Sequence, residues 1–321
     1  FMLDLARAPP AWLTPELLGQ PPEFDALLPY WLGAWAIQAA PGWIPADFAV
    51  RVPFAALLIL TLLATWYGVY YLARTPLAQP VPFAFGGEAL PTDYARAIAD
   101  GGLLALIASL GLAMLSHETT PALAQLGFTT LAFYGAAALP FRTAAPLAAL
   151  VAGLTGLTLS GAPSTAVLLG IGSDAVTLVD TTAEGRDRPA PWLWAALIAA
   201  TTAGVAVLAG ALDLWRWRIA SEDNREWQQA LRLLLWFTWP AGPLAAWTVW
   251  RWRRQLVARH VALPLWFALV AVVSTLLTHS SDRSLLLGLP ALATLAAFAL
   301  PTLRRSVSAL IDWFTLLFFT G

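Results

Sequence analysis

The sequence predicts an all-α membrane protein with about ten transmembrane spans, and two observations lead to this fold class. Hydrophobic residues make up 59% of the 321 positions and charged residues 12%, which is far from the balance of soluble domains. Ten apolar stretches of 15 to 24 residues also occupy most of the chain after position 49. A helix needs about 20 apolar residues to cross the hydrocarbon core of a bilayer, where its backbone groups must be paired within the helix.

The apolar stretches place the spans along a transmembrane domain that covers residues 50–321. Tryptophans cluster at the ends of several stretches, where their amphipathic rings settle at the level of the lipid headgroups. The predicted spans lie near 50–73, 101–116, 120–139, 144–160, 163–181, 191–211, 231–250, 261–278, 285–300 and 306–320.

The arginines predict the direction of these spans. All 18 basic residues are arginine, a bias that is typical of GC-rich bacterial genomes. Alternating spans divide the loops into two sets, one with 11 arginines and one with seven. Because cytoplasmic loops carry the excess of basic residues, we expect the first set to be cytoplasmic. It comprises residues 74–100, 140–143, 182–190, 251–260 and 301–305.

Residues 1–49 are then an extracytoplasmic segment that precedes the first complete span. Eight prolines break this segment, so it cannot form one continuous helix. Its bulky apolar residues, which include Trp12, Trp31 and Trp35, instead favour short amphipathic helices in the plane of the membrane interface. The chain begins without a visible signal peptide and stops within an apolar run, so we expect it to be an internal piece of a longer protein.

The composition excludes several kinds of site. No cysteine is present, which rules out disulfides and thiolate metal sites, and a net charge of −1 gives no indication of nucleic-acid binding. The three histidines lack metal-ligand spacing. Gly170 and Gly172 resemble part of a dinucleotide-binding signature, but they lie in an apolar helix and not after a strand.

Small residues recur every four positions in the span 144–160, at Ala148, Ala152, Gly156 and Ser160. Such a stripe allows helices to approach closely in lipid. We interpret it as a helix-packing surface.

Asp174 lies inside a predicted span, about 10 Å from its inner end at 1.5 Å per residue. A carboxylate at that depth costs roughly 2.5–3.5 kcal/mol on insertion scales, so it is expected to face a cavity or a partner. A neutral or paired structural aspartate and a proton or ion path are both open readings, and the second would make the protein a transporter.

The extracytoplasmic loops combine carboxylates with arginines beside an aromatic-rich segment. Each of these residues is open to two readings, an ordinary solvated or snorkelling charge and a member of a phosphate site. A carboxylate can act as a general base or bind a divalent metal, and candidates are Asp4, Glu23 and Asp25. The guanidinium fork suits phosphate because it gives two parallel charge-assisted hydrogen bonds. The outer-face arginines considered for this role are Arg51, Arg216 and Arg283.

Four short patches, taken in order, resemble bacterial polyprenyl-phosphate-dependent glycosyltransferases, the superfamily of protein mannosyltransferases and aminoarabinose transferases with the GT-C fold. Trp12, Pro15, Leu17 and Gly19 are similar to the family's W-x-x-P-x-L-x-G segment. Residues 28–34 look like its P-L-x-Y-W-L-x-A helix. The other two patches resemble the opening of a span at Arg51 and Pro53 and the entry to a late span at Arg283 and Pro290.

This resemblance implies a multi-pass enzyme of the bacterial inner membrane that moves a sugar from a polyprenyl-phosphate carrier to an extracytoplasmic acceptor. Arg51 first and Arg283 second would hold the lipid phosphate, and a divalent metal is possible. Glu23 and Asp25 are the visible candidates for the base. The family's principal acidic residue is expected upstream of Phe1, with Asp4 as a distant counterpart.

The family's Glu-Lys-Pro element reads here as residues 23–29, and its lysine is absent. This departure favours a second hypothesis, in which the chain is a non-catalytic subunit that binds other membrane subunits. The transporter that uses Asp174 is a third hypothesis.

Overall fold

The computed structural model describes residues 1–7, 12–13, 15, 25–80, 89–179, 191–215, 227–277, 282–303 and 313. Within these residues the chain forms helices and no strand. Three of the helices are long and apolar enough to cross a membrane, namely Ala46–Ala73, Trp192–Ala211 and Arg259–Leu277. The all-α membrane fold is therefore confirmed, whereas the number of ten spans stays a prediction.

Prolines mark the first turn of several helices, where the missing N–H group would have no intrahelical acceptor; α2, α4, α6 and α14 all begin this way. The helices are α1 (Met2–Arg7), α2 (Leu28–Ala39), α3 (Ala46–Ala73), α4 (Pro91–Ile107), α5 (Leu110–Leu115), α6 (Pro121–Ala138), α7 (Ala144–Leu159), α8 (Pro163–Val179), α9 (Pro191–Ala211), α10 (Trp227–Phe237), α11 (Ala241–Arg251), α12 (Arg259–Leu277), α13 (Asp282–Leu286) and α14 (Leu289–Ala299).

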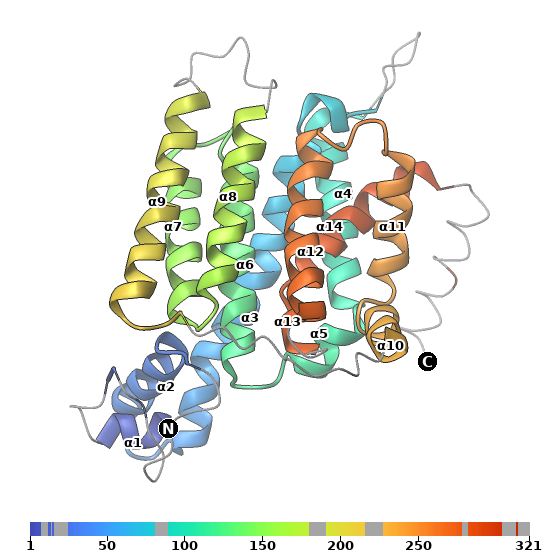
Figure 1. The fold of residues 1–321 in the computed structure, drawn as a ribbon. Helices are drawn as coiled ribbons and strands as arrows, with labels where there is room; N and C mark the ends of the chain where they lie inside the picture. The colour runs from blue at the N-terminus through green and yellow to red at the C-terminus, as the bar shows by residue number, and fades with distance from the viewer. Residues whose placement is uncertain are drawn as a thin grey trace.

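Most of the helices stand side by side in one bundle, and α1 and α2 lie beyond one end of it (Figure 1). We call this the α2 end; α3 begins there, and the turn between α7 and α8 lies there too. The opposite, arginine-rich end carries the loops 74–80, 140–143 and 252–258. The described part of residues 1–49 thus lies away from the arginine-dense loops, as the alternation of spans predicts. That the α2 end is extracytoplasmic stays a prediction.

Three predicted spans are not single helices. The stretch 101–116 belongs to α4, which begins ten residues earlier, and to the separate short helix α5. The stretch 231–250 is divided between α10 and α11 at Pro240, and α10 lies across the α2 end of the bundle (Figure 1). Proline has no N–H to donate and clashes with the preceding turn, which explains this break. The stretch 285–300 likewise divides, into α13 and α14.

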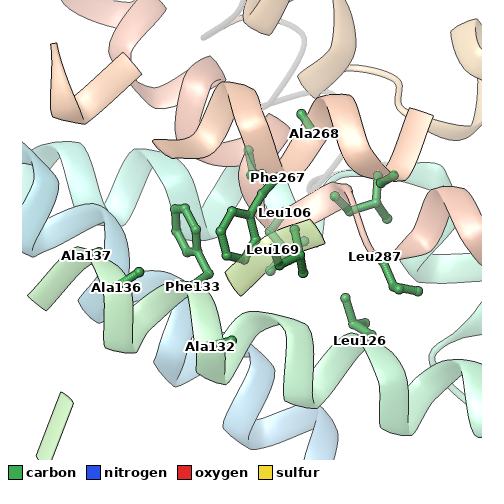
Figure 2. Packing of buried hydrophobic residues seen from close by; sticks show 14 of the residues in the cluster. Leu106, Leu126, Ala132, Phe133, Ala136, Ala137, Leu169, Phe267, Ala268 and Leu287 are labelled. Carbon is green, nitrogen blue, oxygen red and sulfur yellow. The ribbon is translucent and has the colours of Figure 1, made fainter. Parts of the chain in front are cut away.

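The centre of the bundle is apolar and close-packed. Phe133 of α6 and Phe267 of α12 meet edge to face, with ring centroids 5.3 Å apart, among buried leucines and alanines (Figure 2). Helices α6 and α7 approach so closely that a β-carbon on Gly153 would stand 2.5 Å from the backbone nitrogen of Ala132.

The predicted stripe of small residues on α7 is buried only in part. Gly156 packs against the ring of Phe128, and Ser160 is buried, but Ala148 and Ala152 are exposed. The close approach of α7 to α6 therefore uses Gly153 and Gly156, which face α6.

Candidate functional site

The segment that precedes α2 is bonded to the turn between α7 and α8. The backbone N–H of Leu27 donates to the carbonyl oxygen of Leu159 over 2.8 Å. Gly161 follows in this turn with φ +86°, a left-handed conformation that glycine adopts without steric cost. A β-carbon on Gly161 would stand 2.9 Å from the carbonyl oxygen of Asp25. The backbone of Asp25 is therefore packed directly against this turn.

Gln125 of α6 holds the same turn from the other side. Its Nε2 donates a hydrogen bond of 2.7 Å to the carbonyl oxygen of Ser160. The hydroxyl oxygen of Ser160 is buried and has no hydrogen-bond partner among the described residues. We refer to residues 25–27, the turn 159–162 and Gln125 as the α2 junction.

The end of α9 forms another side of the α2 junction. Leu27 is buried with Ala209 and Leu214 in a small apolar cluster. The chain turns after α9 through Asp213, which has φ 50°, a conformation that aspartate tolerates better than most residues. Helices α6, α7 and α9 and the α7–α8 turn thus all contribute to the surroundings of Asp25 and Leu27.

Helix α1 covers α2 and completes a small layer with its own core. Leu5 packs with Ala26, Tyr30 and Ala34, all of which are buried. The indole N–H of Trp31 donates to the carbonyl oxygen of Trp12 over 2.8 Å. Short helices are therefore formed in this segment, and α1 and α2 pack on each other as well as on the bundle. That they lie in the membrane interface stays a prediction.

The structure describes two of the three predicted acidic residues, Asp25 and Asp4. Asp25 is half-buried at the α2 junction. Asp4 lies on α1, and its side chain is half exposed. Glu23 lies outside the described residues. The described part of the chain contains no group of three or more His, Cys, Asp or Glu residues that could hold a metal ion, so the metal prediction gains no ligand set.

The predicted phosphate-binding arginines come from separate helices at the α2 end. Arg51 is exposed near the start of α3, and among the described residues no carboxylate lies within ion-pair distance of it. Arg283 is partly exposed on α13, which packs against α6. Helix α3 also packs against α6, so both arginine-bearing helices contact α6. Arg216 lies outside the described residues.

Asp174 does not join this group. It lies 11 residues after the start of α8, about 16 Å along the helix axis from the α7–α8 turn. Its Oδ1 atom is buried and has no hydrogen-bond partner among the described residues. The surrounding stretch of α8 is packed on two sides, because Gly170 faces Thr202 of α9 and Gly172 faces Trp266 of α12.

Residue types and spacing alone do not indicate that Gln125, Ser160 and Gly161 act as a unit. The signal for the last two was present, since the Ser-Gly-Ala-Pro run between two apolar stretches is typical of a tight turn. Gln125 gave no such signal, because its role depends on a hydrogen bond across 35 positions of the chain.

No protein-family model matches the chain, and no curated protein matches it. The fold is similar to that of ArnT from Cupriavidus metallidurans, which was crystallised with bound undecaprenyl phosphate. The TM-score is 0.63 at 16% sequence identity, and the match covers 98% of this chain and 57% of ArnT. The chain thus spans a little over half of the length of that protein. This likeness confirms a GT-C-like membrane fold and leaves the activity to be argued from the chain's own residues.

Proposed function

We propose that the chain is the membrane portion of a glycosyltransferase that takes a sugar from a polyprenyl-phosphate carrier and passes it to an acceptor at the α2 end. The observation that carries this proposal is the fold's likeness, over 98% of the chain, to a protein crystallised with undecaprenyl phosphate. The inner membrane of a bacterium is the compartment that fits this carrier.

The reaction needs a base and a site for the leaving phosphate. An acceptor hydroxyl attacks the anomeric carbon, and its proton passes to the carboxylate of Asp25. The bond between that carbon and the phosphate oxygen breaks, and the polyprenyl phosphate leaves with the bonding electron pair. Arg51 and Arg283 stabilise the negative charge on the phosphate through charge-assisted hydrogen bonds.

The position of Asp25 suits the base because it is half-buried and held from several directions. Its backbone rests on the α7–α8 turn, and the next residues enter the apolar layer of α1 and α2. Large side chains at the same end are exposed, including Trp35 at 46% and Trp43 at 82%. Exposed indoles at this level favour contact with lipid headgroups, and the carrier's polyprenyl chain would enter from that side.

The first test measures binding of undecaprenyl phosphate to the purified chain by native mass spectrometry. We expect Arg51→Gln and Arg283→Gln each to weaken binding about tenfold, since a hydrogen bond to a charged group contributes roughly 1.5–3 kcal/mol. Arg96→Gln is the matched control, because Arg96 is exposed at the opposite end and already pairs with Asp93 at 3.3 Å. Equal binding by all three variants would contradict the assignment of the phosphate site.

One observation favours the alternative of a non-catalytic membrane subunit. Ala26, which directly follows Asp25, is only 1% exposed and packs in the core of the α1–α2 layer. Alanine at this position supplies no cation for the phosphate. The family that the sequence resembles places a lysine beside its acidic residue. Normal undecaprenyl phosphate binding with no sugar transfer by the intact chain would support this alternative.

A further inference from the structure

Arg74, at the arginine-rich end of α3, is held in place by two aromatic rings. Its guanidinium carbon lies 5.6 Å from the ring centroid of Tyr70 and 5.2 Å from that of Phe141. Such cation–π contacts attract a guanidinium to the face of an aromatic ring. Phe141 belongs to the turn after α6 and packs on Tyr71 at 5.5 Å. Two elements far apart in the sequence thus fix where this cation stands.

The guanidinium of Arg74 is not used to complete the protein's own hydrogen bonding. The last carbonyl groups of α3 are satisfied by other donors: the hydroxyl of Thr75 donates to Leu72 over 2.7 Å, and Nε2 of Gln79 donates to Ala73 over 2.6 Å. Among the described residues no carboxylate lies within ion-pair distance of Arg74. Arg74 is also only partly exposed. A partly desolvated cation with unused donors is suited to an anionic ligand.

A second arginine follows Phe141 in the chain. Arg142 directly follows Phe141 and is exposed, and the described residues place no carboxylate within ion-pair distance of it either. With Arg74 packed on the Phe141 ring and Arg142 next to Phe141 in the chain, two arginines can offer several N–H donors to the oxygens of one phosphate group. Each guanidinium can bind two phosphate oxygens at once through two parallel N–H bonds, which a single ammonium group cannot do.

The surface of α3 below Arg74 is apolar and exposed, so it could accommodate the apolar part of an anionic ligand. Val52, Ile59 and Leu63 are 57%, 58% and 54% exposed. At 100° per residue these positions fall on one helix face together with Tyr70 and Arg74. Leu63 lies about 16 Å below Arg74 along the axis, close to the depth of hydrocarbon in one leaflet, which is about 15 Å.

We propose that this face of α3 binds an anionic phospholipid, with Arg74 and Arg142 on its headgroup phosphate and the acyl chains along Leu63 and Ile59. The site lies at the opposite end of the bundle from the α2 junction, so it is separate from the proposed carrier site. The apolar stripe favours a membrane lipid over free phosphate, since inorganic phosphate makes no use of that surface.

The test uses the full chain in detergent with added lipid, and the bound lipid is counted by native mass spectrometry. The probes are phosphatidylglycerol, zwitterionic phosphatidylcholine with the same acyl chains, and inorganic phosphate. We expect phosphatidylglycerol to bind more tightly than the other two, and Arg74→Gln to weaken its binding about five- to tenfold. Arg142→Gln should have a smaller effect of the same sign, because this side chain is more exposed.

Arg253→Gln is the matched control. Arg253 also stands over an aromatic ring at the arginine-rich end, 5.0 Å from Trp250, but it already donates to the carbonyl oxygen of Trp250 over 3.1 Å. Phosphatidylglycerol binding should not change in this variant. Unchanged binding in Arg74→Gln, an equal loss in Arg253→Gln, or equal affinity for inorganic phosphate would each overturn the proposal. Thermal unfolding of every variant shows whether the fold is intact, and Tyr70→Leu provides a second variant that removes the ring and keeps the cation.

Discussion

The carbonyl oxygen of Asp25 lies 2.9 Å from the point where a β-carbon on Gly161 would stand. The candidate base and the α7–α8 turn are therefore packed backbone against backbone, with no room for a side chain between them. Because both partners are main-chain atoms, neither can rotate away. This contact makes the position of Asp25 depend on residues more than 130 positions later in the sequence.

Gly161→Ala should destabilise the protein and displace Asp25. The φ of +86° costs a non-glycine residue roughly 1–2 kcal/mol, and the new methyl group meets the carbonyl oxygen of Asp25. We expect a lower thermal unfolding midpoint and slower sugar transfer. The measurement is thermal unfolding in detergent together with a transfer assay from a labelled carrier.

Gly42→Ala is the control for this variant, since no atom lies within 4 Å of the position that its β-carbon would take. An unfolding midpoint in Gly161→Ala as high as in Gly42→Ala would show that the turn adapts. The packing argument for Asp25 would then be wrong.

Gln125→Met should weaken the α2 junction from the side of α6. The substitution keeps the length of the side chain but removes the hydrogen bond to the carbonyl of Ser160. An unsatisfied buried polar group costs roughly 1–3 kcal/mol. Gln38→Met removes a comparable bond of 3.0 Å to the carbonyl of Ala6, which is exposed to solvent. We expect the midpoint to fall more in Gln125→Met than in Gln38→Met, and the reverse order would contradict the role of Gln125.

Asp25→Asn should lower the rate of sugar transfer by about 10²–10⁴, the usual contribution of a general base. Carrier binding should change little, because the arginines hold the phosphate. Asp47→Asn is the control, since Asp47 is an exposed carboxylate in the first turn of α3 at the same end. If Asp25→Asn leaves the transfer rate unchanged and Asp4→Asn abolishes it, the base is Asp4 on α1 and not Asp25.

Asp174→Asn separates the enzyme from the transporter. Because Asp174 lies about 16 Å along α8 from the turn, a glycosyltransferase should keep its transfer rate in this variant. A proton- or ion-coupled transporter would lose transport, because an amide cannot carry the charge. Reconstituted vesicles allow both activities to be measured on the same preparation. Loss of sugar transfer in Asp174→Asn would count against the proposed site at the α2 end.

The sequence predicted a helix well where the bounds of the apolar run match those of the observed helix. The predicted stretch 191–211 matches α9, and 144–160 exceeds α7 by one residue. The failures occur where a helix is not uniformly apolar or where an apolar run is not one helix. Helix α4 begins in the polar turn at Pro91 and Asp93, which an apolar window does not count. Pro240 breaks the run 231–250, although Thr238 is the only polar residue in the break.

The candidate site could be predicted less completely than the fold. Asp25 and the interfacial helices around Trp31 follow from residue types and from the resemblance to a known family. The α7–α8 turn does not, because its contact with Asp25 depends on how α2 docks on the bundle, and that arrangement leaves no periodic signal. The same limit applies to Arg74, whose two aromatic partners are 4 and 67 positions away.

Gly153→Ala should disrupt the pairing of α6 and α7. A β-carbon there would stand 2.5 Å from the backbone nitrogen of Ala132 and 2.8 Å from its Cα atom. Backbone atoms cannot be repacked like a side chain, so the two helices must separate, and overpacking of this kind costs roughly 1–3 kcal/mol. Gly204→Ala in α9 has no atom within 4 Å and should instead stabilise its helix slightly, since alanine favours helix over glycine by about 1 kcal/mol. Thermal unfolding of the two variants should therefore shift in opposite directions. A rise in both midpoints would mean that α6 and α7 are not in the close contact described here.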